Sequence, residues 1–243
     1  WCRTLPLFTL GFMASLFYTF IHGKRWALVG AFISLAGLLG LQLEGLAFVP
    51  ILIFALTIYR DKVAWRPLLV GSGLFALVLA PYGVHDALHQ WENLRGLINY
   101  SAGGGKLSLD ALRYALMLTG SAGIEGQAGA YHVQFRHAVP PLWWMNTGMT
   151  LLTLAALLYA LHEAIRGKTL ARRRTFTLMS LWFWVPVALQ LRPGDSTQIH
   201  YFVTQYPAQF LLIASLLTAG LKPSSNKESS KNICPSVIDI RLV

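Results

Sequence analysis

A short polar segment near the C-terminal end of the chain carries residue types that suit an anionic ligand. Arg192, His200 and Tyr201 lie in or just after one loop, which leads directly into an apolar stretch containing Pro207. Arginine offers a fork of donors to a phosphate, and histidine and tyrosine can donate as well. We therefore expect these three residues to form a phosphate-binding site at the mouth of a membrane helix. For any one of these residues taken alone, the alternative is that it belongs to the belt of aromatic and basic residues found at membrane–water interfaces.

Two other ionisable residues are weaker candidates for the same site. Glu44 is the one acid between two apolar runs, and Arg95 lies in the longest loop of the chain. If Glu44 lies at membrane depth, it is a candidate functional residue, because ionisable groups are costly there. If it lies near the surface, it is a simple turn residue.

The sequence supports no metal or cofactor. His85 and His89 stand four apart, but a zinc-protease motif requires Glu directly after the first His, and Asp86 stands there. The segment 101–106 is rich in glycine and ends in Lys, yet Tyr100 and Leu107 occupy positions where a phosphate-binding loop needs Gly and Ser or Thr. The arginine run 172–174 is interpreted as a topology determinant that contacts anionic lipid.

The composition indicates a membrane protein. Hydrophobic residues make up 55% of the 243 residues and charged residues only 12%, about half the share in soluble domains. The net charge of +10 comes from short basic clusters between apolar runs, so nucleic acid is not expected as a partner. A crossing needs ~20 apolar residues. About seven spans are predicted, at 5–21, 26–42, 45–59, 67–82, 143–165, 176–191 and 201–221.

The distribution of basic residues supports this count. The loops 22–25, 60–66 and 166–174 and the tail from 222 are basic, and alternation places all four on one side of the membrane. The opposite side receives the turn at 42–45 and the segment 192–200. It also receives a long loop, 84–141, in which basic and acidic residues balance. Because Lys and Arg mark cytoplasmic loops, the phosphate-binding segment is predicted on the outer face.

The predicted fold class is all-α: a polytopic transmembrane helix bundle over 1–221. Its long outer loop is expected to carry two short interfacial helices. One covers Asp86 to Asn99. The other covers Leu109 to Leu118, with Ser108 as N-cap and an apolar face of Leu109, Leu112 and Leu116. The tail 222–243 is polar and expected to be a disordered cytoplasmic segment.

Two stretches carry a resemblance to a known family. The pattern Arg192, His200-Tyr201-Phe202, Tyr206-Pro207-Ala208 and then an apolar run resembles the late helix of polyprenyl-phosphate-dependent glycosyltransferases of the GT-C class. These are the enzymes of glycosyltransferase family 39 and its relatives, including protein O-mannosyltransferases and lipid A aminoarabinose transferases. The stretch 43–50 and Ala80-Pro81-Tyr82 look like their middle region, and the resemblance covers most of residues 5–221.

The resemblance implies a multi-pass enzyme of the bacterial inner or plasma membrane. Such an enzyme moves a sugar from a polyprenyl-phosphate donor to a glycan, lipid or protein acceptor on the extracytoplasmic face. Its catalytic base is a carboxylate of the first outer loop, which has no match in this sequence. The chain is therefore expected to be an N-terminally truncated piece, possessing the phosphate-binding residues but no assignable catalytic base.

Two other classes of protein are alternatives. A transporter or flippase-like protein for a lipid-linked or anionic substrate is expected to carry ionisable groups deep within its helices. Gln190 and Gln205 are polar residues of the predicted spans, but they are uncharged and do not meet this expectation. A purely structural membrane subunit leaves the cluster at 192–201 unexplained.

Overall fold

The computed structural model describes residues 4–102, 107, 109–120, 140–191 and 199–220. Within these ranges helix is the only regular secondary structure, which confirms the all-α prediction. The first helices along the chain are α1 (Leu5–Phe20), α2 (Ala27–Leu41), η1 (Leu43–Ala47), α3 (Phe48–Ile58), η2 (Arg60–Lys62) and α4 (Trp65–Leu88). They are followed by α5 (Glu92–Ala102), α6 (Asp110–Gly120), α9 (Pro140–Arg166), α10 (Leu170–Leu189), η3 (Ile199–Gln205) and α11 (Tyr206–Gly220).

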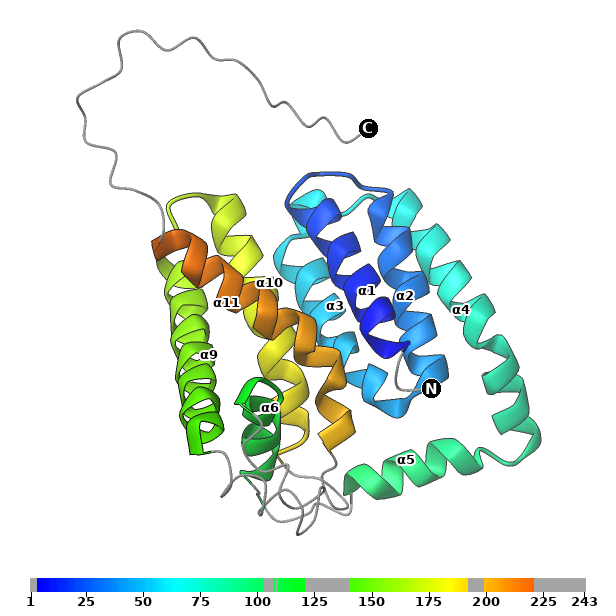
Figure 1. The fold of residues 1–243 in the computed structure, drawn as a ribbon. Coiled ribbons are helices and arrows are strands. Elements are labelled where there is room, and N and C mark those ends of the chain that lie inside the picture. Colours follow the sequence, from blue (N-terminus) through cyan, green and yellow to red (C-terminus); the bar gives the residue numbers. More distant parts are fainter. Residues whose placement is uncertain (1–3, 103–106, 108, 121–139, 192–198, 221–243) are drawn as a thin grey trace, which may run out of the picture.

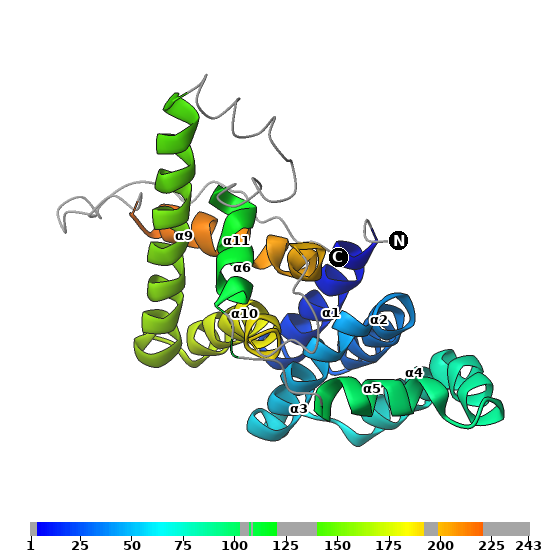
Figure 2. The same cartoon turned by 90° about the horizontal axis from the view of Figure 1, so that it is seen from below.

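Helix α10 lies between two groups of helices and joins their cores. On one side Trp182 packs with Phe12 and Phe48 in a cluster built from α1, α2 and α3. On the other side Phe183 packs with Phe202 in a cluster built from α6, α9 and α11. The view from below shows α10 between α9 and the α1–α3 group (Figure 2). Adjacent residues of one helix therefore anchor both halves of the bundle.

Helices α1 and α2 approach each other closely because small residues line their contact. Gly11 lies against the hydroxyl of Ser34, Gly30 against the hydroxyl of Ser15, and Gly37 against the ring of Phe8. A Cβ atom at Gly11 or Gly30 would displace the serine hydroxyl, and one at Gly37 would clash with the ring. Small residues at helix contacts are typical of membrane bundles, where helices gain stability from close packing rather than from removing apolar surface from water.

The helix ends gather at two opposite ends of the molecule. The connections α1–α2, α3–α4 and α9–α10 lie at the upper end in Figure 1, and α11 finishes there. The α2–η1 turn, α5, α6 and η3 lie at the lower end. The connections at the upper end carry Lys24, Arg25, Arg60, Lys62 and Lys168, so this is called the basic end. The three predicted basic loops within the described residues, 22–25, 60–66 and 166–174, therefore lie at the same end of the molecule.

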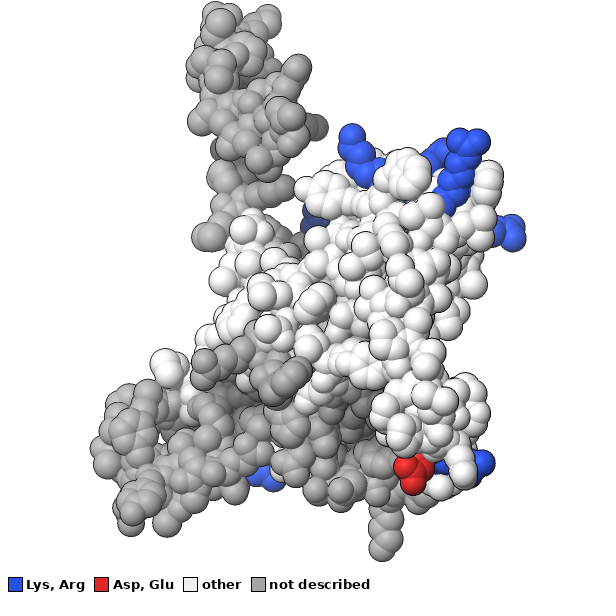
Figure 3. Space-filling view, turned by 90° about the vertical axis from the view of Figure 1, so that its right-hand side faces the viewer, with Lys and Arg blue, Asp and Glu red and all other residues white. Residues whose placement is uncertain are grey.

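The flank between the two ends is apolar. Helix α4 buries only Pro67, Gly71 and Asp86, while Leu69 and Leu77 are more than half exposed. The space-filling view shows this flank almost without charged residues, with Lys and Arg concentrated at the basic end (Figure 3). Monomeric soluble proteins rarely expose contiguous apolar patches of more than a few hundred Å². A hydrocarbon environment is the simplest physical account of such a surface.

Three helical stretches of the described residues are long and apolar enough to cross a membrane: Trp65–Leu88, Trp144–Arg166 and Phe202–Gly220. The expectation of about seven spans is therefore not supported by helix length. The apolar helices Leu5–Phe20, Ala27–Leu41 and Gly45–Ile58 are shorter, because turns at 21–26, at Gln42 and at Tyr59 end them early. Helix α10 has 20 residues, but three of its first five are arginines.

A sharp corner, rather than a surface helix beginning at Asp86, joins α4 to α5. Helix α4 runs six residues beyond the predicted end at Tyr82 and takes in Asp86. The Asp86 carboxylate accepts hydrogen bonds from the backbone N–H groups of Asn93 (2.9 Å) and Leu94 (3.2 Å), capping α5 across the corner. Gln90 and Trp91 take positive φ values of 57° and 62° to complete the turn. The exposed Leu94 and Ile98 of α5 fit the predicted interfacial character.

The second predicted interfacial helix corresponds to α6, and two residues of its predicted apolar face, Leu112 and Leu116, pack against the core cluster. Ala111 and Ala115 are fully buried against the neighbouring helices, whereas Leu109 is 71% exposed. The small alanines allow α6 to pack closely on α9, so it is an integral part of the bundle. Ser108, the predicted N-cap, and the tail 222–243 lie outside the described residues.

Candidate functional site

Four of the five predicted site residues belong to elements at the end opposite the basic end. His200 and Tyr201 lie in η3, Glu44 lies in η1 and Arg95 lies in α5, all at the lower end in Figure 1. Arg95 is exposed. Arg192 and the side chains of His200, Tyr201 and Glu44 lie outside the described part of the chain. The backbone thus brings three of the candidate segments to one end, while the geometry of the predicted cluster stays a prediction.

The segment η3 is held firmly at this end by its neighbours. Phe202, which follows Tyr201, is fully buried. The indole Nε1 of Trp182 on α10 donates to the backbone oxygen of Thr204 at 2.9 Å. One turn further along, Gln209 Nε2 donates to the Ala115 oxygen of α6 at 2.8 Å. His200 and Tyr201 therefore begin a segment that is fixed to both α10 and α6.

A buried amide in η3 has an unmet hydrogen-bonding capacity. Gln205 is fully buried, and neither its Oε1 nor its Nε2 has a partner among the described residues. A buried amide without hydrogen bonds costs about 1–3 kcal/mol, so such groups are rare in native structures. This polar side chain lies in the same short helix as His200 and Tyr201, and it was not among the predicted site residues.

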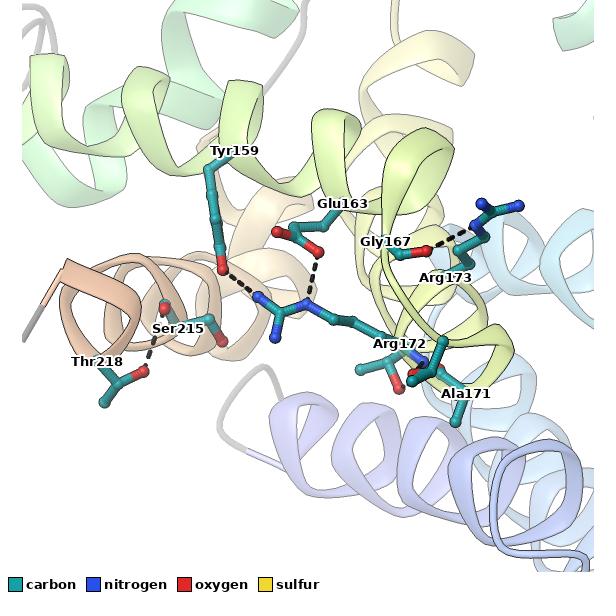
Figure 4. Close-up of polar contacts among 10 residues, drawn as sticks. Tyr159, Glu163, Gly167, Ala171, Arg172, Arg173, Ser215 and Thr218 are labelled. Atoms are coloured by element: carbon teal, nitrogen blue, oxygen red, sulfur yellow. Dashed lines mark hydrogen bonds and ion pairs between the residues drawn. The ribbon is translucent and has the colours of Figure 1, made fainter. Parts of the chain in front are cut away.

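A second polar cluster, at the basic end, was not predicted from the sequence. Arg172 Nε donates to Glu163 Oε2 at 2.5 Å, and Arg172 Nη2 donates to the Tyr159 hydroxyl at 2.6 Å (Figure 4). The hydrogen bond to Glu163 is the main cause that raises the pKa of Arg172 above its usual value. Tyr159 and Glu163 are four residues apart on α9, which puts both on one helix face.

The neighbouring arginines make their own internal contacts. Arg173 Nε donates to the Gly167 oxygen at the end of α9, at 2.8 Å. Arg174 donates to the Phe20 oxygen (3.1 Å) and to the Asp61 carboxylate (3.3 Å), and its guanidinium lies 4.8 Å from the centroid of the Tyr59 ring. Arginines 172–174 therefore bond α10 to its neighbouring segments, in addition to contributing positive charge.

An open cavity of about 260 Å³ adjoins this second cluster. It lies between α9, α10 and α11 and is lined by Tyr159, Arg172, Phe176, Ser215, Thr218 and Ala219. The sequence offered one signal for it: Ser215 and Thr218 are three apart on α11 and share a helix face.

Neither end of the molecule presents a metal site among the described residues. No group of three His, Cys, Asp or Glu side chains is close enough there to hold an ion. His85 and His89 do lie together, with stacked rings 4.1 Å apart, but His89 Nδ1 is 2.7 Å from the His85 backbone oxygen, and this hydrogen bond accounts for the arrangement.

No protein-family model, curated protein or solved structure matches the sequence or the fold.

Proposed function

We propose that the chain is the membrane-embedded, carrier-binding part of a glycosyltransferase that uses a polyprenyl-phosphate sugar. Arg192, His200 and Tyr201 would hold the phosphate of the lipid carrier at the end of the molecule opposite the basic end. The acceptor would be a glycan, lipid or protein on the extracytoplasmic face of a bacterial inner or plasma membrane. Arg95 and Glu44 are secondary candidates for contacts with the donor.

The observation that carries this proposal is the fixed position of η3. Trp182 and Gln209 tie this segment and the start of α11 to the surrounding helices, so the chain enters its last helix at a defined point. The buried, unpartnered amide of Gln205 in the same segment adds a polar group that a ligand or a bound water can satisfy. A polar segment held in place next to the apolar helix α11 suits a ligand with an anionic head and a hydrocarbon tail.

We further propose that the whole bundle is embedded in a membrane, with about seven crossings. In support, α1, α2, η1 with α3, and α10 each run between the same two ends as the three longer helices (Figure 1). A helix of 16 residues is about 24 Å long, several Å less than the hydrocarbon core. Bilayer thinning and flanking basic residues accommodate such shortfalls at modest cost.

Direct binding of undecaprenyl phosphate tests the phosphate site without requiring a catalytic base. The chain in lipid nanodiscs should bind this ligand, and Arg192→Ala should weaken the binding about ten- to a hundredfold, because a charge-assisted hydrogen bond contributes about 1.5–3 kcal/mol. Arg113→Ala is the matched control, because Arg113 is an exposed arginine of α6 at the same end. Equal affinity of the Arg192 and Arg113 variants would remove the proposed site.

A further inference from the structure

The cavity at the basic end has hydrogen-bond donors on one side and acceptors on the other. Arg172 uses Nε and Nη2 for Glu163 and Tyr159, which leaves the N–H groups of Nη1 as donors. The Tyr159 oxygen accepts from Arg172, so its own O–H can donate to a ligand. On α11, Ser215 donates to the Leu211 oxygen at 2.7 Å and Thr218 to the Ala214 oxygen at 2.9 Å, so both hydroxyl oxygens remain acceptors. Figure 4 shows the guanidinium of Arg172 between α9 and these two hydroxyls.

The charge of the cavity favours a ligand with no net charge. Glu163, whose side chain is 13% exposed, neutralises the nearest cation, Arg172. A simple anion would meet this neutral pair and two acceptor hydroxyls. A zwitterion fits better, because a phosphate can accept from Arg172 and Tyr159 while an ammonium group donates to Ser215 and Thr218.

The position of the cavity matches the headgroup level of a bilayer. Tyr159 lies seven residues before Arg166, the end of α9, which is about 10 Å along the helix axis. Ser215 lies five residues before Gly220, or about 8 Å from the end of α11. Leu211, which is 43% exposed, lies one turn deeper than Ser215 on the same helix face. A ligand in the cavity can therefore extend a hydrocarbon chain over Leu211 towards the membrane centre.

We propose that this cavity binds the headgroup of a phospholipid that carries both a phosphodiester and a primary ammonium group. Arg172 and Tyr159 hold the phosphate, Ser215 and Thr218 accept from the ammonium, and an acyl chain lies along α11. At about 260 Å³ the cavity is slightly smaller than the usual range for drug-sized ligands, in keeping with a lipid headgroup. The site is at the opposite end from the proposed carrier-phosphate site and does not depend on it.

Native mass spectrometry of the purified chain in detergent tests this proposal. With equimolar phosphatidylethanolamine and phosphatidylglycerol, we expect one retained phosphatidylethanolamine and at least fivefold preference over phosphatidylglycerol. Tyr159→Phe should lower its retention about fivefold, and Thr218→Ala should reduce the preference between the lipids, because each removes one hydrogen bond of about 1 kcal/mol. Arg172→Ala is avoided because it leaves Glu163 without its cation.

Thr57→Ala is the matched control for Thr218→Ala. Thr57 on α3 is exposed and donates to the oxygens of Ile53 and Phe54, the same bonding pattern that Thr218 has on α11. Far-ultraviolet circular dichroism confirms that each variant is folded, and Ser215→Ala replaces any variant that is not. Equal retention of the two lipids, variants that match Thr57→Ala, or displacement of the lipid by an equimolar amount of soluble phosphoethanolamine would each overturn the proposal.

Discussion

The three arginines 172–174 show how neighbouring residues of one type can serve three different contacts. Arg172 and Arg173 stand in the first turn of α10, where the helix dipole disfavours positive charge, and Arg174 follows directly. The Thr169 hydroxyl caps this turn by accepting from the Arg172 N–H at 3.2 Å. Glu163 and Asp61 place carboxylates beside the side chains of Arg172 and Arg174. These contacts offset the unfavourable position and join α10 to α9 and to the η2 turn.

Arg174→Ala should lower the free energy of unfolding by about 2 kcal/mol. Its side chain is 11% exposed, and its loss leaves the Phe20 oxygen and Asp61 without this donor and uncovers the ring of Tyr59. Thermal unfolding in detergent is the measurement, with Arg60→Ala as control, because Arg60 is an exposed arginine of the same end. A Tm for Arg174→Ala that equals the Tm of the control would show that the contacts of Arg174 do not stabilise the fold.

At the level of the secondary-structure elements, hydropathy predicted most helix boundaries to within a few residues. The polar break at Gln42 separates α2 from η1 as expected, and Tyr59 ends α3. Two boundaries were missed because the stabilising contacts are polar. Thr169 caps α10, which begins six residues before the predicted start, and Asp86 caps α5 across the corner from α4. A count of apolar residues cannot detect caps of this kind.

Gly45→Ala tests how tightly η1 packs on the helix before it. A Cβ atom at this position would lie 2.7 Å from the backbone carbon of Leu38 and 2.9 Å from its oxygen, closer than van der Waals contact allows. Since backbone must move, we expect a loss of about 1–3 kcal/mol in unfolding free energy. Gly73→Ala on α4, where a Cβ meets nothing within 4 Å, should leave stability unchanged or raise it. Equal changes in unfolding free energy for the two substitutions would contradict the close packing of η1 on α2.

For the whole molecule, the sequence predicted the helical class and the grouping of loops, but not the lengths of the helices. Loop charge follows chain order, so alternation can be worked out from residues 22–25, 60–66 and 166–174 alone. Helix length depends on where tertiary contacts and turns end each helix. The cluster of Tyr159, Glu163 and Arg172 also needed the three-dimensional arrangement, because its members come from two helices. For Arg192, His200 and Tyr201 the prediction of a shared phosphate site still rests on the sequence.

The orientation of the bundle can be measured with single cysteines after Cys2 and Cys234 are replaced by serine. We expect Lys62→Cys, at the basic end, to react with a membrane-impermeant maleimide only after the cells are permeabilised. Arg95→Cys, on the exposed surface of α5, should react in intact spheroplasts. Reaction of both positions from the same side would contradict an embedded bundle with its basic end in the cytoplasm.

The central claim is that the lipid carrier binds at the segment that contains Arg192 and η3, and photo-crosslinking tests this claim most directly. A polyprenyl phosphate with a diazirine next to its phosphate would be irradiated with the membrane-embedded chain, and the labelled peptide identified by mass spectrometry. The account predicts that the label falls within residues 192–206 and is displaced by excess unlabelled undecaprenyl phosphate. A label concentrated on the cavity of Tyr159, Arg172 and Ser215, or one that the competitor does not displace, would contradict it.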